Sequence, residues 1–216
     1  MKKLFIAAAV VSALSGCATV NQPIDQKAVD AIKGQTVTHT ARAEKPSFVA
    51  MTAGKAAFAL LGAAAMISEG NGIVASNAIP DPADFIATEL TQALQTAHGA
   101  TALPAVRVDG DAVGQLATAA GSAKYVIDVQ TTQWTFAYFP TDWTHYYVIY
   151  GAKARLIDTA TKTVMAEGAC SRSTKDAPGA PTYDEMLANG AKRLKGDLST
   201  VAAECLQQFK RDTFKL

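Results

Sequence analysis

The 216-residue chain has no apolar run long enough to cross a membrane. Its two longest apolar stretches, Leu4–Leu14 and Ala56–Ile67, contain eleven and twelve residues. A membrane-spanning helix needs about 20 consecutive apolar residues. No spanning helix is therefore expected.

The chain also lacks an excess of either charge. Twenty Lys and Arg residues face 19 Asp and Glu residues, a formal net charge of +1 at pH 7. Removal of residues 1–16, which include Lys2 and Lys3 and no acidic residue, leaves a formal charge of about −1. Binding to nucleic acid needs a basic surface, so no nucleic-acid partner is expected.

Catalytic and metal-binding motifs are missing as well. The sequence contains no Gly-x-Ser-x-Gly elbow, no His-Glu-x-x-His and no phosphate loop. Its three histidines, His39, His98 and His145, are far apart in the chain, and neither they nor the cysteines have metal-ligand spacing. We therefore expect a non-catalytic protein with no metal and no cofactor.

What is present begins at the N-terminus. A cationic start, Met1-Lys2-Lys3, and the apolar stretch Leu4–Leu14 are typical of a secretory signal peptide. The stretch ends in Leu14-Ser15-Gly16-Cys17, which resembles the lipobox of bacterial lipoproteins. An ordinary cleaved signal peptide with an incidental cysteine is the alternative.

The lipobox resemblance implies a location. Cys17 would be the first mature residue, with a diacylglycerol on its thiol and an acyl chain such as palmitate on its amine. Several acyl chains make membrane anchoring stable. Ala18 in place of Asp at the next position implies export to the outer membrane. We expect the body to lie on the periplasmic face of that membrane, with the outer face as the alternative.

The body is expected to be a single α/β domain with a leading part. Residues 17–33 predict a tether, 34–80 an apolar and Gly-rich leading segment, and 81–216 the domain. Within the leading segment, Gln35–Ala43 predicts a strand and 69–82 a loop. Lys55–Gly70 predicts a helix that is either buried in the core or in contact with a membrane or a second subunit.

The domain itself shows clear boundaries. Asp81-Pro82 predicts the start of a helix that ends at His98-Gly99, and Asp111 is expected to cap a short helix that ends at Gly121. Three strands follow at 124–138, 143–157 and 163–171, and a last helix runs from Tyr183 to Phe209. This order predicts an α/β (α+β) fold, a mixed sheet with a three-stranded antiparallel meander and helices on one face.

The run Trp134–Tyr150 holds eight of the sixteen aromatic residues. If it is a hairpin in which Tyr138 faces Trp143, each pair of facing residues has numbers that sum to 281. One side then carries Val129 and Ala152 and belongs to the core. The other side carries an ion pair, Asp128 with Lys153, and so is expected to meet water. It also carries the aromatic set predicted to bind a partner or ligand, Trp134, Phe136, Tyr138, Trp143, His145 and Tyr147.

Two alternatives for this aromatic face remain open. A bulge near Thr131–Gln133 would shift the register by one residue and turn part of the face inward. Alternatively, the segment 48–79 covers the face. An uncovered face of this kind is a contact surface, because Trp and Tyr favour interfaces.

Two cysteines, Cys170 and Cys205, remain in the mature body. The strand pattern places Cys170 inward, and the last helix carries Cys205 on its apolar stripe. Export to an oxidising compartment favours a disulfide between them. Two buried free thiols are the alternative.

From Asp81 to Phe209 the element order is similar to the periplasmic domains of envelope lipoproteins such as the curli-secretion channel lipoprotein. Asp81-Pro82 and the phrase "AVGQLATAAGSAKYVIDV" carry this resemblance. The segment 48–79 and the aromatic hairpin depart from it. We therefore expect a lipoprotein that binds or scaffolds an envelope component, with self-association as a possibility. The alternatives are a carrier or chaperone for a hydrophobic ligand and an envelope hydrolase.

Overall fold

The computed structural model describes residues 21–56 and 59–216, and over this part of the chain the strands form one seven-stranded mixed sheet. Its main path is β3 (Thr101–Ala102), β1 (Thr36–Arg42), β5 (Tyr125–Phe139), β6 (Asp142–Asp158) and β7 (Thr163–Ser173). In addition, β2 (Val49–Met51) pairs with β5 and β4 (Val106–Val108) pairs with β1. The β5–β6–β7 meander is antiparallel, as predicted, and the pairs that involve β1 and β2 are parallel.

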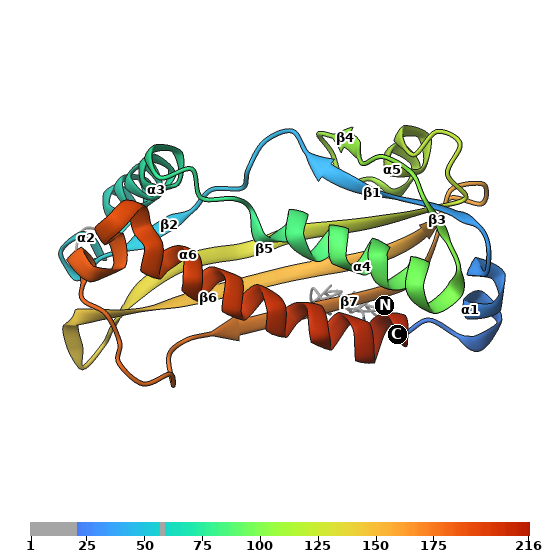
Figure 1. Ribbon diagram of the computed structural model, residues 1–216. Helices are drawn as coiled ribbons and strands as arrows, with labels where there is room; N and C mark the ends of the chain where they lie inside the picture. The colour runs from blue at the N-terminus through green and yellow to red at the C-terminus, as the bar shows by residue number, and fades with distance from the viewer. Residues whose placement is uncertain (1–20, 57–58) are drawn as a thin grey trace, which may run out of the picture.

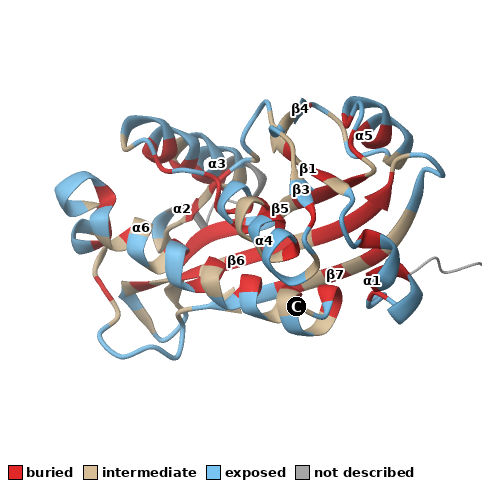
Figure 2. Ribbon diagram, turned by 45° about the vertical axis from the view of Figure 1, so that its right-hand side comes forward, coloured by how far each residue is buried: buried red, intermediate tan, exposed pale blue. Residues whose placement is uncertain are grey.

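Helices α4 (Pro82–His98) and α6 (Tyr183–Gln208) cross the same face of this sheet (Figure 1). The main core lies beneath them, and buried positions follow the central strands (Figure 2). Its members include Ile86, Leu90, Ile127, Tyr150 and Leu198, each at most 2% exposed. The predicted fold class is therefore confirmed.

The opposite face of the sheet carries a second, smaller cluster. Helix α5 (Val113–Ala119) places Leu116 and Ala117 against Val126 of β5 and Ile157 of β6. The side chain of Asp111 does not cap α5, whose N-cap is Ala112 and has no side-chain hydrogen bond. The rest of this face has no helix packed on it within the described part of the chain.

A buried ion-pair network adjoins this small cluster. Asp128 is fully buried and faces Arg155, which donates to it from Nε (3.1 Å) and a terminal nitrogen (2.6 Å). Arg42 and the Thr40 hydroxyl also donate to Asp128. The predicted water-exposed pair of Asp128 with Lys153 is therefore wrong, because the register differs by two residues and two arginines enclose the carboxylate.

The leading part of the chain belongs to the same sheet. β1 pairs with the first half of β5, and β2 pairs with its second half, from Val49 opposite Thr135 to Met51 opposite Ala137. Residues 26–32, predicted to be part of a tether, form helix α1 (Gln26–Ile32), which is capped by Asp25 and buries Val29 and Ile32. The chain is thus anchored to the fold well before residue 33.

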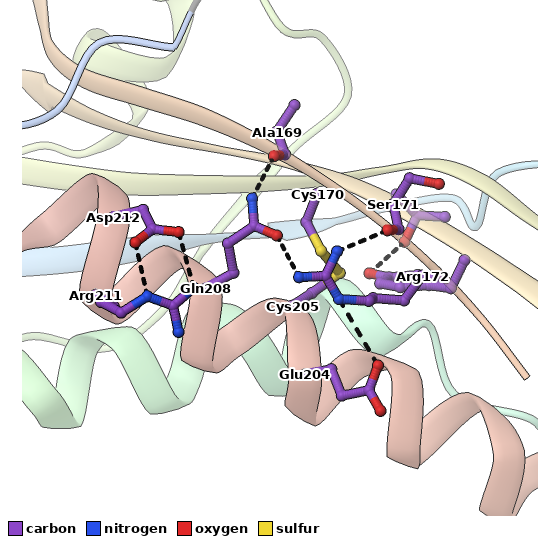
Figure 3. Close-up of a disulfide and its surroundings, with 11 residues drawn as sticks. Ala169, Cys170, Ser171, Arg172, Glu204, Cys205, Gln208, Arg211 and Asp212 are labelled. Carbon is purple, nitrogen blue, oxygen red and sulfur yellow. Dashed lines mark hydrogen bonds and ion pairs between the residues drawn. A yellow bond between two sulfur atoms is a disulfide. The ribbon is translucent and has the colours of Figure 1, made fainter. Parts of the chain in front are cut away.

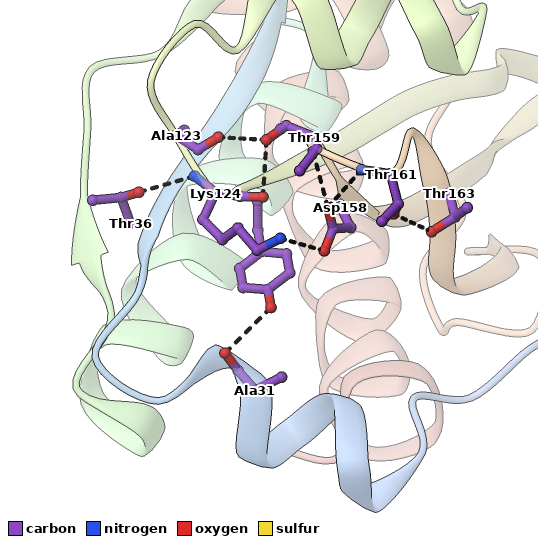
Figure 4. A network of polar contacts seen from close by, with 10 residues as sticks. Ala31, Thr36, Ala123, Lys124, Asp158, Thr159, Thr161 and Thr163 are labelled. Atoms are coloured by element: carbon purple, nitrogen blue, oxygen red, sulfur yellow. Dashed lines mark hydrogen bonds and ion pairs between the residues drawn. The ribbon is translucent and has the colours of Figure 1, made fainter.

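Polar contacts close the end of the sheet next to α1 (Figure 4). Lys124 Nζ lies 2.6 Å from Asp158, whose other carboxylate oxygen accepts two backbone N–H groups in the β6–β7 turn. The Thr36 hydroxyl accepts from the Lys124 backbone N–H, and the Tyr125 hydroxyl donates to the Ala31 carbonyl in α1. These bonds join α1, β1 and the meander at one end.

At the other end lie α2 (Ala53–Ala56) and α3 (Ala59–Ser76) (Figure 1). The predicted loop at 69–82 is wrong in its first half, because α3 continues to Ser76. The expectation of a helix buried on most sides is also not met, since Ala64, Ile67 and Ser68 are exposed. α3 packs on β2 through Gly70, where a Cβ would lie only 2.1 Å from the Phe48 carbonyl oxygen.

A disulfide between Cys170 and Cys205 joins helix α6 to β7, and this is the pairing that the sequence predicted (Figure 3). Beside it, Gln208 donates to the Ala169 carbonyl and accepts from Arg172, which protects the outer edge of β7. α6 is not the uniform helix that was predicted, since Ala188–Ala191 leave helical geometry. It ends in a π-helical segment, η1 (Phe209–Phe214).

Candidate functional site at the tip of the aromatic hairpin

A β-bulge divides the β5–β6 hairpin. Thr131 faces Ala152, whereas Gln133 faces Gly151, so Thr132 is the extra residue. Below the bulge the residues of β5 at odd numbers point to the helices, and above it those at even numbers do. The single register that sums to 281 is therefore wrong, and the bulge foreseen as the alternative is present.

The bulge removes two residues from the predicted contact surface. Trp134 is 2% exposed and Phe136 is fully buried, and both belong to the main core. Phe48 packs against both rings, at centroid distances of 5.2 and 5.8 Å. The Trp134 indole N–H donates to the Pro46 carbonyl at 3.0 Å. Pro46 and Phe48, which lie just before β2, thus cover this part of the hairpin.

The other four predicted residues stay at least partly accessible. Tyr138 is half-buried on the helix side and packs against the core. Trp143, His145 and Tyr147 lie on the opposite side of β6, and Trp143 is 67% exposed. The described part of the chain leaves no other large apolar side chain so exposed.

One aromatic residue of the tip was not predicted. Phe139 packs on Tyr147 with ring centroids 4.9 Å apart. Phe139 lies beyond a second register shift, between Tyr138 and Phe139, and faces Asp142, so the hairpin pattern alone did not predict its contact with Tyr147. Phe139, Trp143, His145 and Tyr147 are called the tip surface below.

The polar groups of the tip form hydrogen bonds with one another within the turn. The Thr144 hydroxyl and backbone N–H both donate to Asp142, at 2.6 and 3.1 Å. His145 Nδ1 lies 2.5 Å from the other carboxylate oxygen of Asp142. The Thr144 hydroxyl, the Thr144 N–H and His145 together lower the pKa of Asp142 to about 2. The tip therefore carries a negative charge at neutral pH beside its aromatic rings.

The three histidines lie in different elements. His39 is in β1, where its Nδ1 lies 3.2 Å from the Thr91 hydroxyl, and burial lowers its pKa. His98 ends α4, and His145 is at the tip. Within the described residues no group of three or more His, Cys, Asp and Glu side chains is placed to hold a metal ion.

The N-terminal predictions lie partly outside the described residues. The signal peptide 1–16, the lipobox and Cys17 fall there. Among the described residues, Gln22 is the first that pairs with the sheet, and it exchanges two backbone hydrogen bonds with Glu167 of β7, at 2.7 and 2.9 Å. Among the described helices, none combines the length and apolar character needed to span a bilayer.

Comparisons with known proteins identify no family. No family model matches the chain, and no curated protein matches it. Among solved structures, a PelC dodecamer from Paraburkholderia phytofirmans aligns with 12% identity and a TM-score of 0.37, over 87% of this chain and 93% of that one. The hypothetical protein CT253 from Chlamydia trachomatis aligns with 8% identity and a TM-score of 0.43, over 83% and 94%.

A third structure is lipoprotein GNA1162 from Neisseria meningitidis, with 12% identity and a TM-score of 0.28, over 82% of this chain and 99% of that one. TM-scores this low carry no inference about function.

Proposed function

We propose that the protein is a non-catalytic lipoprotein, anchored through Cys17 to the periplasmic face of the outer membrane, that binds an envelope protein through the tip surface. The lipobox supports the anchor, and the exposed aromatic tip supports the partner. The observation that carries the proposal is the position of Gln22, because it sets the distance between the anchor and the body.

Gln22 is paired with Glu167 by two backbone bonds, and the Ile24 N–H donates to the Thr213 carbonyl at 2.8 Å. Only five peptide steps separate Cys17 from Gln22, and a fully extended chain covers at most about 3.6 Å per residue, or roughly 18 Å. A lipid on Cys17 would therefore hold the body directly at the membrane surface. A protein on a long flexible tether would instead sample a large volume.

The tip surface lies at the far end of the same sheet. Glu167 of β7 faces Arg155 of β6, and Trp143 lies twelve residues before Arg155 in the same strand. At about 3.3 Å per residue, the tip lies roughly 40 Å from the anchored strand. A short tether and a rigid hairpin would thus present the aromatic tip at a defined distance from the lipid.

The tip suits a protein partner. Trp and Tyr are enriched among residues that contribute most to binding energy at protein interfaces. Phe139 and Tyr147 form a paired aromatic platform, and the ionised Asp142 adds a charge that can select a partner.

The carrier alternative receives no support from the geometry. It required a space between the hairpin and the segment 48–79, and Phe48 occupies that position against Trp134 and Phe136. We therefore assign partner binding to the outside of the hairpin.

The anchor is tested by Cys17→Ser. We expect the wild-type protein to fractionate with membranes and to carry the mass of its acyl chains, and the variant to lose both properties. A wild-type protein with a free Cys17 thiol would overturn the anchoring.

The tip surface is tested by photo-crosslinking in cells from position 143, with position 161 in the β6–β7 turn as the control. We expect one protein to be captured from 143 and not from 161. Trp143→Ala should abolish its co-purification without changing thermal unfolding. Equal capture from both positions, or unchanged co-purification by Trp143→Ala, would contradict the proposal.

A further inference from the structure

An apolar groove runs between the start of α4 and the middle of α6. It has a volume of about 320 Å³. Its lining is mainly apolar and includes Ile79, Pro82, Leu198 and Ala202, all of them buried. The groove lies on the helical layer and is therefore separate from the tip surface.

An aromatic side chain stands at the edge of this groove. Phe85 is 43% exposed, although the next residue of α4, Ile86, is fully buried in the core. In the described part of the chain only Ile67, Phe85 and Trp143 are large apolar residues with such exposure. The same patch thus contains an apolar depression and an apolar projection.

The edges of the groove also carry opposite charges. Asp84 lies on the α4 side and Lys195 on the α6 side. Among the described residues neither side chain has an ion-pair partner within 4 Å, and they do not pair with each other. Burial and the charge of Asp81 raise the pKa of Asp84, and the charge of Lys45 opposes them.

We propose that this patch binds a second copy of the chain in a two-fold symmetric pair. In a two-fold interface each copy uses the same surface, so a contact from Asp84 to Lys195 of the second copy is matched by the reverse contact. Phe85 of each copy would cover the groove of the other. The patch is complementary to itself, because it holds the projection, the depression and both charges. A binding site for an unrelated ligand would not need this self-complementarity.

The pairing of charges gives a direct test. The mature lipidated protein is purified in detergent with two different tags, and self-association is measured by sedimentation velocity and by co-purification of the tags. We expect wild-type copies to pair. Asp84→Lys and Lys195→Asp alone should each weaken pairing roughly tenfold or more, because like charges then face each other.

Mixing the two single variants should restore pairing, since Lys at 84 and Lys195 of one copy then face Asp at 195 and Asp84 of the other. The double variant in one chain should also pair with itself. Glu89→Lys on α4 and Lys192→Asp on α6, which do not line the groove, serve as controls and should pair like the wild type.

Three results would overturn the proposal. They are a wild-type protein that stays monomeric at every concentration measured, single variants that pair like the wild type, and a mixture that stays unpaired. Thermal unfolding checks that each variant folds, which is expected because neither side chain has an internal ion pair. Capture of a partner from position 143 is independent of these results, so the two proposals can fail separately.

Discussion

Phe48 meets Trp134 edge to face, with ring centroids 5.2 Å apart and an interplanar angle of 84°. The contact joins residues that are 86 positions apart and connects the leading segment to the hairpin. Phe48 packs against Trp134 and Phe136, two of the six residues that the aromatic pattern alone assigned to a partner, and both are buried. The two tryptophans of the chain therefore have opposite environments.

That difference is measurable by fluorescence. Trp143→Phe leaves only the buried Trp134, so its emission should be blue-shifted and poorly quenched by iodide. Trp134→Phe leaves only Trp143, which should emit near the wavelength of indole in water and be quenched strongly. Similar spectra for both variants, without any partner, would contradict the shifted register.

The close approach of α3 to β2 predicts opposite effects for two neighbouring glycines. Gly70→Ala places a Cβ against the Phe48 carbonyl oxygen and should lower the free energy of unfolding by about 1–3 kcal/mol. Gly72→Ala meets no atom within 4 Å and should raise it by up to about 1 kcal/mol, because alanine favours helix more than glycine. Urea denaturation of both variants measures their free energies of unfolding, and changes of the same sign would contradict the close approach of α3 to β2.

The buried network around Asp128 predicts a large loss of stability. Asp128→Ala leaves the guanidinium groups of Arg42 and Arg155 without a counter-charge, which costs about 3–5 kcal/mol for buried pairs. Lys153→Ala, on the same face of the sheet, should change stability by no more than about 0.5 kcal/mol. Comparable losses in the two variants would indicate that the network is not buried.

The buried carboxyl group of Asp81 should make the stability of the protein depend on pH in the opposite direction to most carboxylates. Burial raises its pKa, against the opposing effect of its hydrogen bonds from Thr131 and Ala83. The folded state then holds this proton more tightly than the unfolded state, so stability decreases as pH rises from the unfolded pKa through the folded pKa.

Asp81→Asn keeps an acceptor for the α4 N-cap and removes the charge. Its stability relative to the wild type should therefore increase as pH rises above about 4. Asp81→Ala also loses the cap and should be destabilised by about 1 kcal/mol relative to Asp81→Asn. Denaturation curves between acidic and neutral pH test both, and a difference that does not vary with pH would contradict the raised pKa.

The disulfide predicts a stability that depends on oxidation. Cys170 and Cys205 are 35 residues apart, and the chain-entropy model gives about 4 kcal/mol for a loop of this length. The double substitution to Ala should lose about this amount. A reducing agent should then destabilise the wild type and leave the double variant unchanged, whereas two titratable thiols in the unreduced, unfolded wild type would exclude the bond.

Local signals in the sequence determined the elements with strong caps or periodicity. Asp81-Pro82 marks the start of α4 and Gly99 its end. Asp81 accepts a backbone N–H of the first turn, and Gly99 adopts the left-handed conformation that ends the helix, so neither signal needs distant residues. The three meander strands and the inward direction of Cys170 follow from period-2 alternation, which survives a register error of two residues. The lipobox is likewise local, and lipidation at Cys17 stays a prediction.

Tertiary structure alone decided the rest. The bulge at Thr132 is one residue that no local pattern requires, yet it turns Trp134 and Phe136 into the core and leaves Trp143 and Tyr147 outside. Whether Asp128 is solvated or buried depends on Arg42, which arrives from another strand. The anchoring of Gln22 depends on a free edge of β7, so only the assembled sheet shows how close to a membrane the body would be held.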